Sequence, residues 1–267
     1  MRTTALVAVN VFRESVRDKV LYNLVVFAVL LIGASYLIGQ LTAGQDIKII
    51  KDLGLAAISL FGVMMAVFIG IGLVWKEVEK RSIYSLLSKP VSRFQFVVGK
   101  YLGLVLTLVV NVTAMTAAYY ATLAIMNATG AAGTAGGATP AADPALLKAI
   151  VLIVVELAIV TAIALCFSTF SSPFLSAILT ISLWVVGHFN TDFRNLGTLL
   201  ESPAAGWLGR VLYYVLPNFS ALDIKSQVVH GVPVAGAYVG VLSLYGAVYV
   251  VLLLVVAVTI FSRRDFK

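Results

Sequence analysis

The sequence predicts an all-α membrane protein with six transmembrane helices, both termini in the cytoplasm and an amphipathic interfacial helix near the N-terminus. Hydrophobic residues make up 61% of the 267 residues and charged residues only 12%, against about 25% in soluble domains. So few polar side chains cannot cover a soluble globule. The composition therefore excludes a soluble enzyme, a disordered chain and a fibrous repeat, and it predicts a single transmembrane domain over residues 1–267.

Six apolar runs predict the membrane helices. About 20 helical residues span the hydrocarbon core of a bilayer, and solidly apolar runs argue against the alternating pattern of a strand barrel. The fifth run is the shortest, and we expect Pro173 and Thr191 to extend it. The runs are Leu21–Leu41, Leu53–Trp75, Tyr101–Met126, Ala149–Phe170, Phe174–Asn190 and Gly236–Phe261.

The basic residues predict the orientation. Most of the 19 Lys and Arg residues lie before the first run, between the second and third runs, or after the sixth. Cytoplasmic flanks of membrane helices have such an excess, so these zones and both termini are predicted to be cytoplasmic. Segments 42–52, 127–145 and 191–235 then face outward. The net charge of +7 therefore reflects topology in a lipid bilayer and does not predict a nucleic-acid partner. The first run is also too long for a cleavable signal peptide.

Residues 4–19 predict an amphipathic helix in the cytoplasmic membrane interface. Its polar face includes Arg13, Glu14 and Arg17. Its apolar face repeats through Ala5, Val9, Phe12 and Val16. Two interpretations stay open: a helix that only lies on the membrane, or one whose polar face also contacts a cytoplasmic protein.

The cytoplasmic segment 76–100 predicts a helix–turn–helix elbow dense in charge. Glu77–Leu87 can form a short helix, which Pro90 cannot continue. A second helix is predicted to start at Pro90 and to run into the third membrane helix. The segment is either a solvated loop that follows the positive-inside rule or a surface that docks into a groove on another protein.

The outward segment 191–235 predicts one further helix. Ser202 is a favourable cap and Pro203 a favourable first residue, and apolar residues follow at helical spacing until Pro217. The helix is too short to span and contains Arg210. We therefore predict an interfacial or re-entrant helix.

Glu156 is the only carboxylate within an apolar run. Ionised in the middle of the bilayer, it would cost about 3 kcal/mol or more, so we expect it to be neutral or paired. Asn111 lies near the middle of the third run and is a candidate hydrogen-bond partner. Three roles stay open for the two residues: lining a translocation path, an interhelical tie of about 0.6–2 kcal/mol, or a coupled proton site.

Small residues stand four apart on two of the runs. Such spacing lets helices approach closely and fits a subunit interface. The residues are Gly62, Ala66 and Gly70 on the second run and Gly236 and Gly240 on the sixth.

Several motifs are absent from the sequence. It contains no G-x-x-x-x-G-K-[ST] nucleotide loop, no H-E-x-x-H and no G-x-S-x-G. One cysteine and two distant histidines predict no metal site. A polytopic membrane enzyme is disfavoured because catalytic clusters are missing. A stand-alone secondary transporter is disfavoured because one intramembrane carboxylate is few for that class.

Three stretches resemble the permeases of ABC-2 type transporters: Phe12–Tyr22, the elbow residues Glu77–Arg93 with Gly99-Lys100 after them, and Leu216–Phe219. The resemblance covers essentially the whole chain and extends to a branch linked to multi-copper enzyme maturation. It implies six spans in the cell membrane. It also implies a second permease subunit, as a homodimer or heterodimer, and a separate ABC ATPase that binds ATP and Mg. The chain itself would be a non-catalytic transport subunit without a cofactor, and we expect an exporter.

The resemblance also implies roles for particular residues. The helix over 4–19, with Arg13, Glu14 and Arg17, would be the family's connecting helix. The elbow would be the coupling helix that seats on the ATPase, and segment 191–235 would match the family's re-entrant helices. The implied ATPase contacts are Glu77, Glu79, Lys80, Arg81, Tyr84, Lys89, Pro90 and Arg93.

Overall fold

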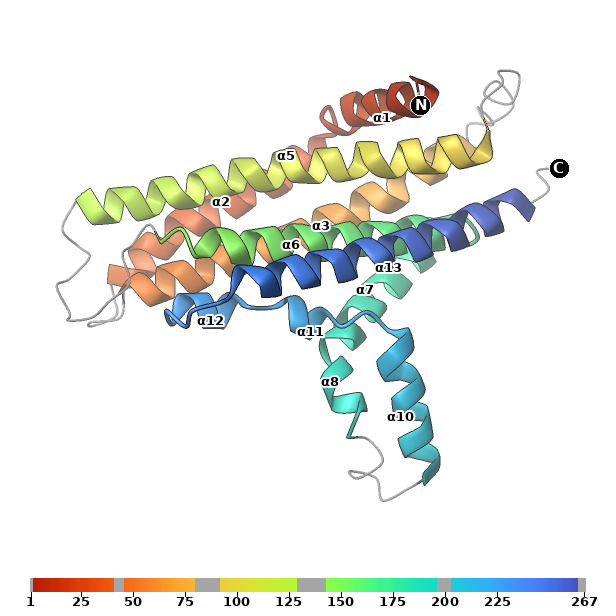
Figure 1. The fold of residues 1–267 in the computed structure, drawn as a ribbon. Helices are drawn as coiled ribbons and strands as arrows, with labels where there is room; N and C mark the ends of the chain where they lie inside the picture. Colours follow the sequence, from red (N-terminus) through yellow and green to blue (C-terminus); the bar gives the residue numbers. More distant parts are fainter. Residues whose placement is uncertain (1, 41–45, 80–91, 129–142, 196–202, 264–267) are drawn as a thin grey trace.

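A computed structural model describes residues 2–40, 46–79, 92–128, 143–195 and 203–263. These residues form helices joined by turns and contain no strand (Figure 1). The helices are α1 (Arg2–Ser15), α2 (Lys19–Gln40), α3 (Asp46–Glu79), α5 (Arg93–Ala128), α6 (Leu146–Ser168), α7 (Pro173–His188), α8 (Asn190–Phe193), α10 (Pro203–Val215), α11 (Phe219–Leu222), α12 (Lys225–Val229) and α13 (Gly236–Arg263).

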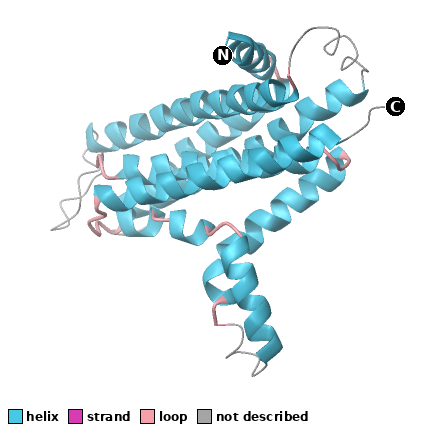
Figure 2. Cartoon of the chain, turned by 45° about the vertical axis from the view of Figure 1, so that its right-hand side comes forward, coloured by secondary structure: helices cyan, strands magenta, loops and turns pink. Residues whose placement is uncertain are grey.

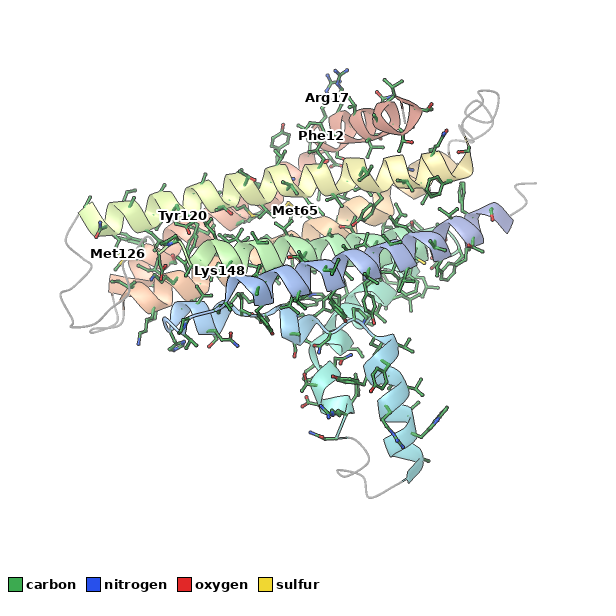
Figure 3. All side chains as sticks on the ribbon, in the orientation of Figure 1. Phe12, Arg17, Met65, Tyr120, Met126 and Lys148 are labelled. Atoms are coloured by element: carbon green, nitrogen blue, oxygen red, sulfur yellow. The ribbon has the colours of Figure 1, made fainter. Side chains whose placement is uncertain are left out.

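Helices α3, α5 and α6 form the centre of a bundle. They pack against one another, while α2 covers α3 and α5, and α13 covers α6 and α5. Met65 of α3 is fully buried among these helices (Figure 3). The outer faces of α2 and α13 are apolar and exposed. In a membrane such faces contact lipid, since lipid tails are as apolar as these side chains.

Five helices are long and apolar enough to cross a membrane, and they match five of the six predicted runs. They are Lys19–Ile38, Ile47–Ile71, Phe94–Ala128, Leu146–Ser168 and Gly236–Ser262. The remaining run corresponds to α7, which has 16 residues and a length of about 24 Å. Because the hydrocarbon core is about 30 Å thick, the count of six spans stays a prediction.

The boundaries of α7 are set by its sequence. Ser172 Oγ accepts the Leu175 backbone N–H at 3.4 Å, and Pro173 occupies the first turn, which is a favourable helix start. Phe189 leaves the helical conformation at φ −91° and ψ 12°. Thr191 therefore does not extend α7, contrary to our expectation, and belongs to α8.

The described residues of segment 191–235 include four short helices where we predicted one. Helix α10 begins at Pro203 as predicted, and α8 and α10 form a hairpin that projects from the bundle (Figures 1 and 2). Asn190 Nδ2 donates to Tyr213 O at 3.3 Å and to Leu216 O at 3.1 Å, and so closes the hairpin by capping the last carbonyls of α10. Helices α11 and α12 return along α6, and α12 also contacts α3.

Helix α1 packs lengthwise on the first turns of α5. A Cβ atom at Gly99 would lie 2.8 Å from Val7 Cβ, and one at Gly103 would lie 2.6 Å from Ala8 O. Gly99 and Gly103, which are four residues apart on α5, therefore let the backbone of α1 approach closely. Helix α1 ends at Ser15 and not at residue 19, because Asp18 Oδ1 accepts the Val20 backbone N–H at 3.0 Å and starts α2.

Two lysines that we assigned to connections lie buried in helices. Helix α3 begins at Asp46, so Lys51 belongs to its second turn and not to an outward connection. Lys100 is buried in α5, with Nζ 5.0 Å from the Phe96 ring centroid. A lysine can be buried along its aliphatic stem, and a cation over an aromatic face is favourable. The described residues of the elbow form the end of α3 and the start of α5.

The small residues of α3 pack within the chain. A Cβ atom at Gly62 would lie 2.7 Å from Leu157 Cδ1, and one at Gly70 would lie 2.6 Å from Ala164 Cβ. These glycines form the α3–α6 contact, which corrects their assignment to a subunit interface. On α13, by contrast, a Cβ atom at Gly236 or at Gly240 would have nothing within 4 Å.

Candidate functional site

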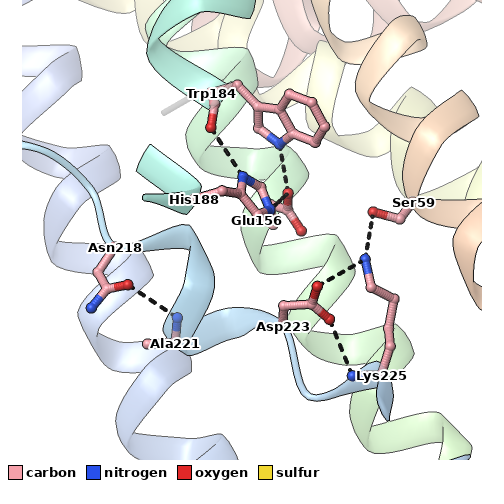
Figure 4. A network of polar contacts seen from close by, with 8 residues as sticks. All are labelled: Ser59, Glu156, Trp184, His188, Asn218, Ala221, Asp223 and Lys225. Atoms are coloured by element: carbon pink, nitrogen blue, oxygen red, sulfur yellow. Dashed lines mark hydrogen bonds and ion pairs between the residues drawn. The ribbon is translucent and has the colours of Figure 1, made fainter. Parts of the chain in front are cut away.

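Glu156 lies in the middle of α6 and points toward α7. Its side chain is 2% exposed. Its Oε1 atom accepts a hydrogen bond from Trp184 Nε1 at 2.6 Å (Figure 4). A buried tryptophan ring contributes apolar packing while its N–H requires an acceptor. The carboxylate therefore provides that acceptor across the α6–α7 contact.

His188 lies one turn after Trp184 on the same face of α7, since residues four apart in a helix are neighbours. Its Nδ1 atom is 3.0 Å from Trp184 O, and its Nε2 atom is 3.7 Å from Glu156 Oε1. The imidazole ring also stacks on Phe219 of α11, with 5.7 Å between centroids. Helix α7 thus presents an indole N–H and an imidazole to one carboxylate oxygen.

A second charged pair lies beside Glu156. Lys225 Nζ is 3.4 Å from Asp223 Oδ2 and donates to Ser59 Oγ at 3.3 Å (Figure 4). Asp223 Oδ1 accepts the Lys225 backbone N–H at 3.2 Å.

We call these six residues, Ser59, Glu156, Trp184, His188, Asp223 and Lys225, the polar network. Its contacts form two groups: Glu156, Trp184 and His188 join α6 to α7, and Ser59, Asp223 and Lys225 join α3 to the segment around α11 and α12. Chemically, it can tie helices together and hold protons. No three His, Cys, Asp or Glu side chains are grouped to hold a metal ion in the part of the chain that the structure describes.

Asn111 does not pair with Glu156. It is half-buried on α5, and no hydrogen bond joins the two described side chains. The expected pair is wrong because the Glu156 side chain faces α7. The role of Asn111 along a pathway stays a prediction.

Three of the predicted ATPase contacts lie at the ends of two central helices. Glu77 and Glu79 lie in the last turn of α3, and Arg93 is the first residue of α5. Lys80, Arg81, Tyr84, Lys89 and Pro90 lie outside the described residues. The contact of this segment with an ATPase stays a prediction.

The charged residues assigned to the connecting helix are all exposed. Arg13 and Glu14 lie in the last turn of α1, and Arg17 lies in the turn that follows. Arg17 points away from the bundle (Figure 3). The residues of α1 that face α5 are Thr4, Val7, Ala8 and Val11. Ala5 and Val9 of the predicted apolar face are exposed.

Glu156 could be predicted from the sequence as a charged residue within an apolar run, but its neighbours were not among the predicted site residues. The available signal was the pair Trp184 and His188, which are polar-tipped residues four apart in an apolar run. No sequence pattern placed Asp223 and Lys225 beside Glu156, because they come from a connecting segment that folds back along the bundle.

No curated protein matches the chain. Residues 5–266 match the family described as ABC-2 family transporter protein, so the match covers nearly all of the chain, including α1, the elbow and α13. The chain therefore belongs to the ABC-2 transporter family and is a multi-pass membrane permease of an ABC transporter.

Proposed function

We propose that the chain is the non-catalytic permease subunit of an ATP-driven exporter in the cell membrane. Two permease subunits enclose the translocation path, and a separate ABC ATPase subunit binds ATP and Mg. Family membership supports this proposal. The sequence contains no G-x-x-x-x-G-K-[ST] nucleotide-binding loop, and we assign ATP hydrolysis to a separate ATPase chain. Membership in the branch linked to copper-enzyme maturation stays a prediction.

The position of the elbow is the observation that supports coupling best. It joins the end of α3 to the start of α5, which are two central helices of 34 and 36 residues. Each is continuous from the elbow to the opposite end of the bundle (Figure 1). A helix transmits a push along its axis because its backbone is hydrogen-bonded throughout. A partner that moves the elbow would therefore move the centre of the bundle.

Helix α1 supports the same proposal. Its backbone lies against Gly99 and Gly103 in the first turns of α5, and its charged residues Arg13 and Glu14 are exposed. A protein seated on the elbow would thus also reach α1. Movement of α5 would shift α1 along the membrane surface.

Purification from native membranes in mild detergent tests this function. We expect the tagged chain to co-purify an ATPase that contains a nucleotide-binding loop, with measurable ATP hydrolysis and two permease copies per complex by native mass spectrometry. The double variant Glu77→Ala/Arg81→Ala should lose the ATPase, since it removes one acidic and one basic group from the elbow.

The matched control is Asp192→Ala/Arg194→Ala, which removes the same two charge types from exposed positions at α8. This control should retain the ATPase at the wild-type ratio. The coupling proposal is wrong if no ATPase co-purifies with the wild-type chain. It is also wrong if both double variants, present in the membrane at equal amounts, retain the ATPase equally.

A further inference from the structure

The last turn of α10 ends beside the middle of α13, a helix long and apolar enough to cross a membrane. Pro217 has no backbone N–H, so Tyr213 O lacks the partner that would continue α10. Tyr249, which bonds this turn, lies in the middle of the 28 residues of α13. Because the centre of a bilayer holds no water, the free carbonyls of α10 need partners within the protein.

Side chains from two different elements supply these partners. Asn190 Nδ2 donates to Tyr213 O at 3.3 Å and to Leu216 O at 3.1 Å. The Tyr249 hydroxyl donates to Val215 O at 3.2 Å. Asn190 is the first residue of α8, so its bonds hold the two helices of the hairpin together. Tyr249 belongs to α13, so its bond holds the end of α10 on the bundle.

The hairpin joins the bundle through two non-helical connections. Phe189 separates α7 from α8, and residues 216–218 separate α10 from α11. Asn190 follows the first connection and bonds to Leu216 in the second, so the two breaks lie side by side. Beyond them the hairpin projects from the bundle in both views (Figures 1 and 2). Breaks at the ends of helices are where packed units turn relative to one another.

A second tyrosine lies one turn before Tyr249 and contacts the same connection. The Asn218 backbone N–H donates to the Tyr245 hydroxyl at 2.9 Å, and the two tyrosine rings lie 5.0 Å apart. An average hydrogen bond between membrane helices changes an equilibrium constant only about threefold. Bonds of this strength form and break readily, so they hold the hairpin reversibly.

We propose that Tyr249, together with Tyr245, is a latch that sets the position of the α8–α10 hairpin on the bundle. With the latch closed, the hairpin has the position seen in Figure 1. With the latch open, it turns about Phe189 and Pro217, while Asn190 keeps α8 and α10 together. The two tyrosines are positioning residues. The latch is a property of the fold and does not depend on the proposed exporter function.

Distances between two spin labels in the full-length chain test the latch. One label is placed on the hairpin at Ala204→Cys and the other on α2 at Leu30→Cys, since both residues are exposed. Cys166→Ala removes the one native cysteine. The labelled chain is placed in lipid nanodiscs with an excess of unlabelled chain, so that both labels of a measured pair lie in one molecule.

Tyr249→Phe removes the hydroxyl and keeps the ring. We expect the distance distribution of the hairpin pair to broaden. The ratio of seated to displaced hairpins should be about threefold lower than in the wild-type chain, and about eightfold lower in Tyr245→Phe/Tyr249→Phe, which removes two bonds. An unchanged distribution in the double variant would overturn the latch.

Tyr238→Phe is the matched control. Its hydroxyl is on the same helix and donates to Ala221 O at 3.4 Å, a carbonyl on the bundle side of the connection at 216–218. This variant should leave the hairpin distribution unchanged, and equal broadening would overturn the assignment of the latch to Tyr249.

A label pair within the bundle, Leu30→Cys with Val251→Cys, separates the latch from general loosening. Both residues are exposed, and their distance should not change in Tyr249→Phe. If this pair broadened as much as the hairpin pair, the tyrosine would hold the bundle as a whole and the latch would be wrong.

The wild-type background alone gives a second test should a tyrosine variant fail to fold. There the hairpin pair should have a broader distribution than the bundle pair, and equal widths would show a hairpin fixed without a hinge. These measurements involve no ATPase and no transported substrate. A negative result therefore leaves the proposed exporter function standing, and absence of an ATPase partner would leave the latch standing.

Discussion

Helix α6 contacts α3 on one side and α7 on another, and the two contacts are built differently. Against α3, the glycines Gly62 and Gly70 let Leu157 and Ala164 come within van der Waals reach. Against α7, the buried Glu156 accepts the Trp184 N–H and faces His188. The α3–α6 contact depends on the close fit of small residues, and the α6–α7 contact includes a hydrogen bond between side chains.

The difference between the two contacts predicts that α7 separates from α6 more easily than α3 does. Close packing of small residues leaves no room for adjustment, because interiors are packed like crystals. A hydrogen bond between membrane helices contributes only about 0.6 kcal/mol on average. We therefore regard α3 and α6 as one fixed unit. Helix α7, with the projecting hairpin of α8 and α10, is attached to that unit by the hydrogen bond between Trp184 and Glu156.

The largest expected loss in the free energy of unfolding comes from a substitution in the close contact between α3 and α6. Gly70→Ala places a Cβ atom 2.6 Å from Ala164 Cβ, so the helices must move apart, and we expect a loss of about 1–3 kcal/mol in the free energy of unfolding. Unfolding in detergent mixtures measures it. Gly33→Ala on α2 is the control, because nothing lies within 4 Å there and alanine is the better helix former. A tolerated Gly70→Ala would contradict the close α3–α6 contact.

A smaller effect is expected from the polar contact. Glu156→Ala leaves the half-buried Trp184 N–H without its acceptor, and we expect a loss of about 0.6–1.7 kcal/mol, the range for hydrogen bonds between membrane helices. Glu156→Gln keeps an acceptor oxygen and should lose less. The same unfolding measurement ranks the two variants, and an equal loss would mean that the hydrogen bond to Trp184 contributes nothing.

The smallest effect is expected at the edge of the polar network. Ser59→Ala removes one acceptor from Lys225 Nζ, which keeps Asp223 at 3.4 Å. The expected loss is about 0.5 kcal/mol, near the mean for hydrogen bonds between membrane helices. A loss as large as that of Glu156→Ala would show that Ser59 and Glu156 act as one unit.

The sequence predicted the long helices because each apolar run is long enough to require burial in lipid. It did not predict where the helices end, since Lys51 and Lys100 are buried although charge alone assigns them to connections. It shows that an ionised Glu156 would be costly in the membrane. It also suggests Asn111 as a partner, because both residues lie near the middle of their apolar runs. The actual partners Trp184 and His188 depend on which face of α6 meets α7, and that is settled by tertiary packing.

A double-mutant cycle between Glu156 and Trp184 tests most directly whether a hydrogen bond attaches α7 to α6. The free energy of unfolding would be measured for the wild-type chain, Glu156→Leu, Trp184→Phe and the double variant. We expect a coupling energy of about 0.6–1.7 kcal/mol, the range found for hydrogen bonds between membrane helices. Additive effects, with no coupling, would show that α7 is held by apolar packing alone and would contradict the distinction between the two sides of α6.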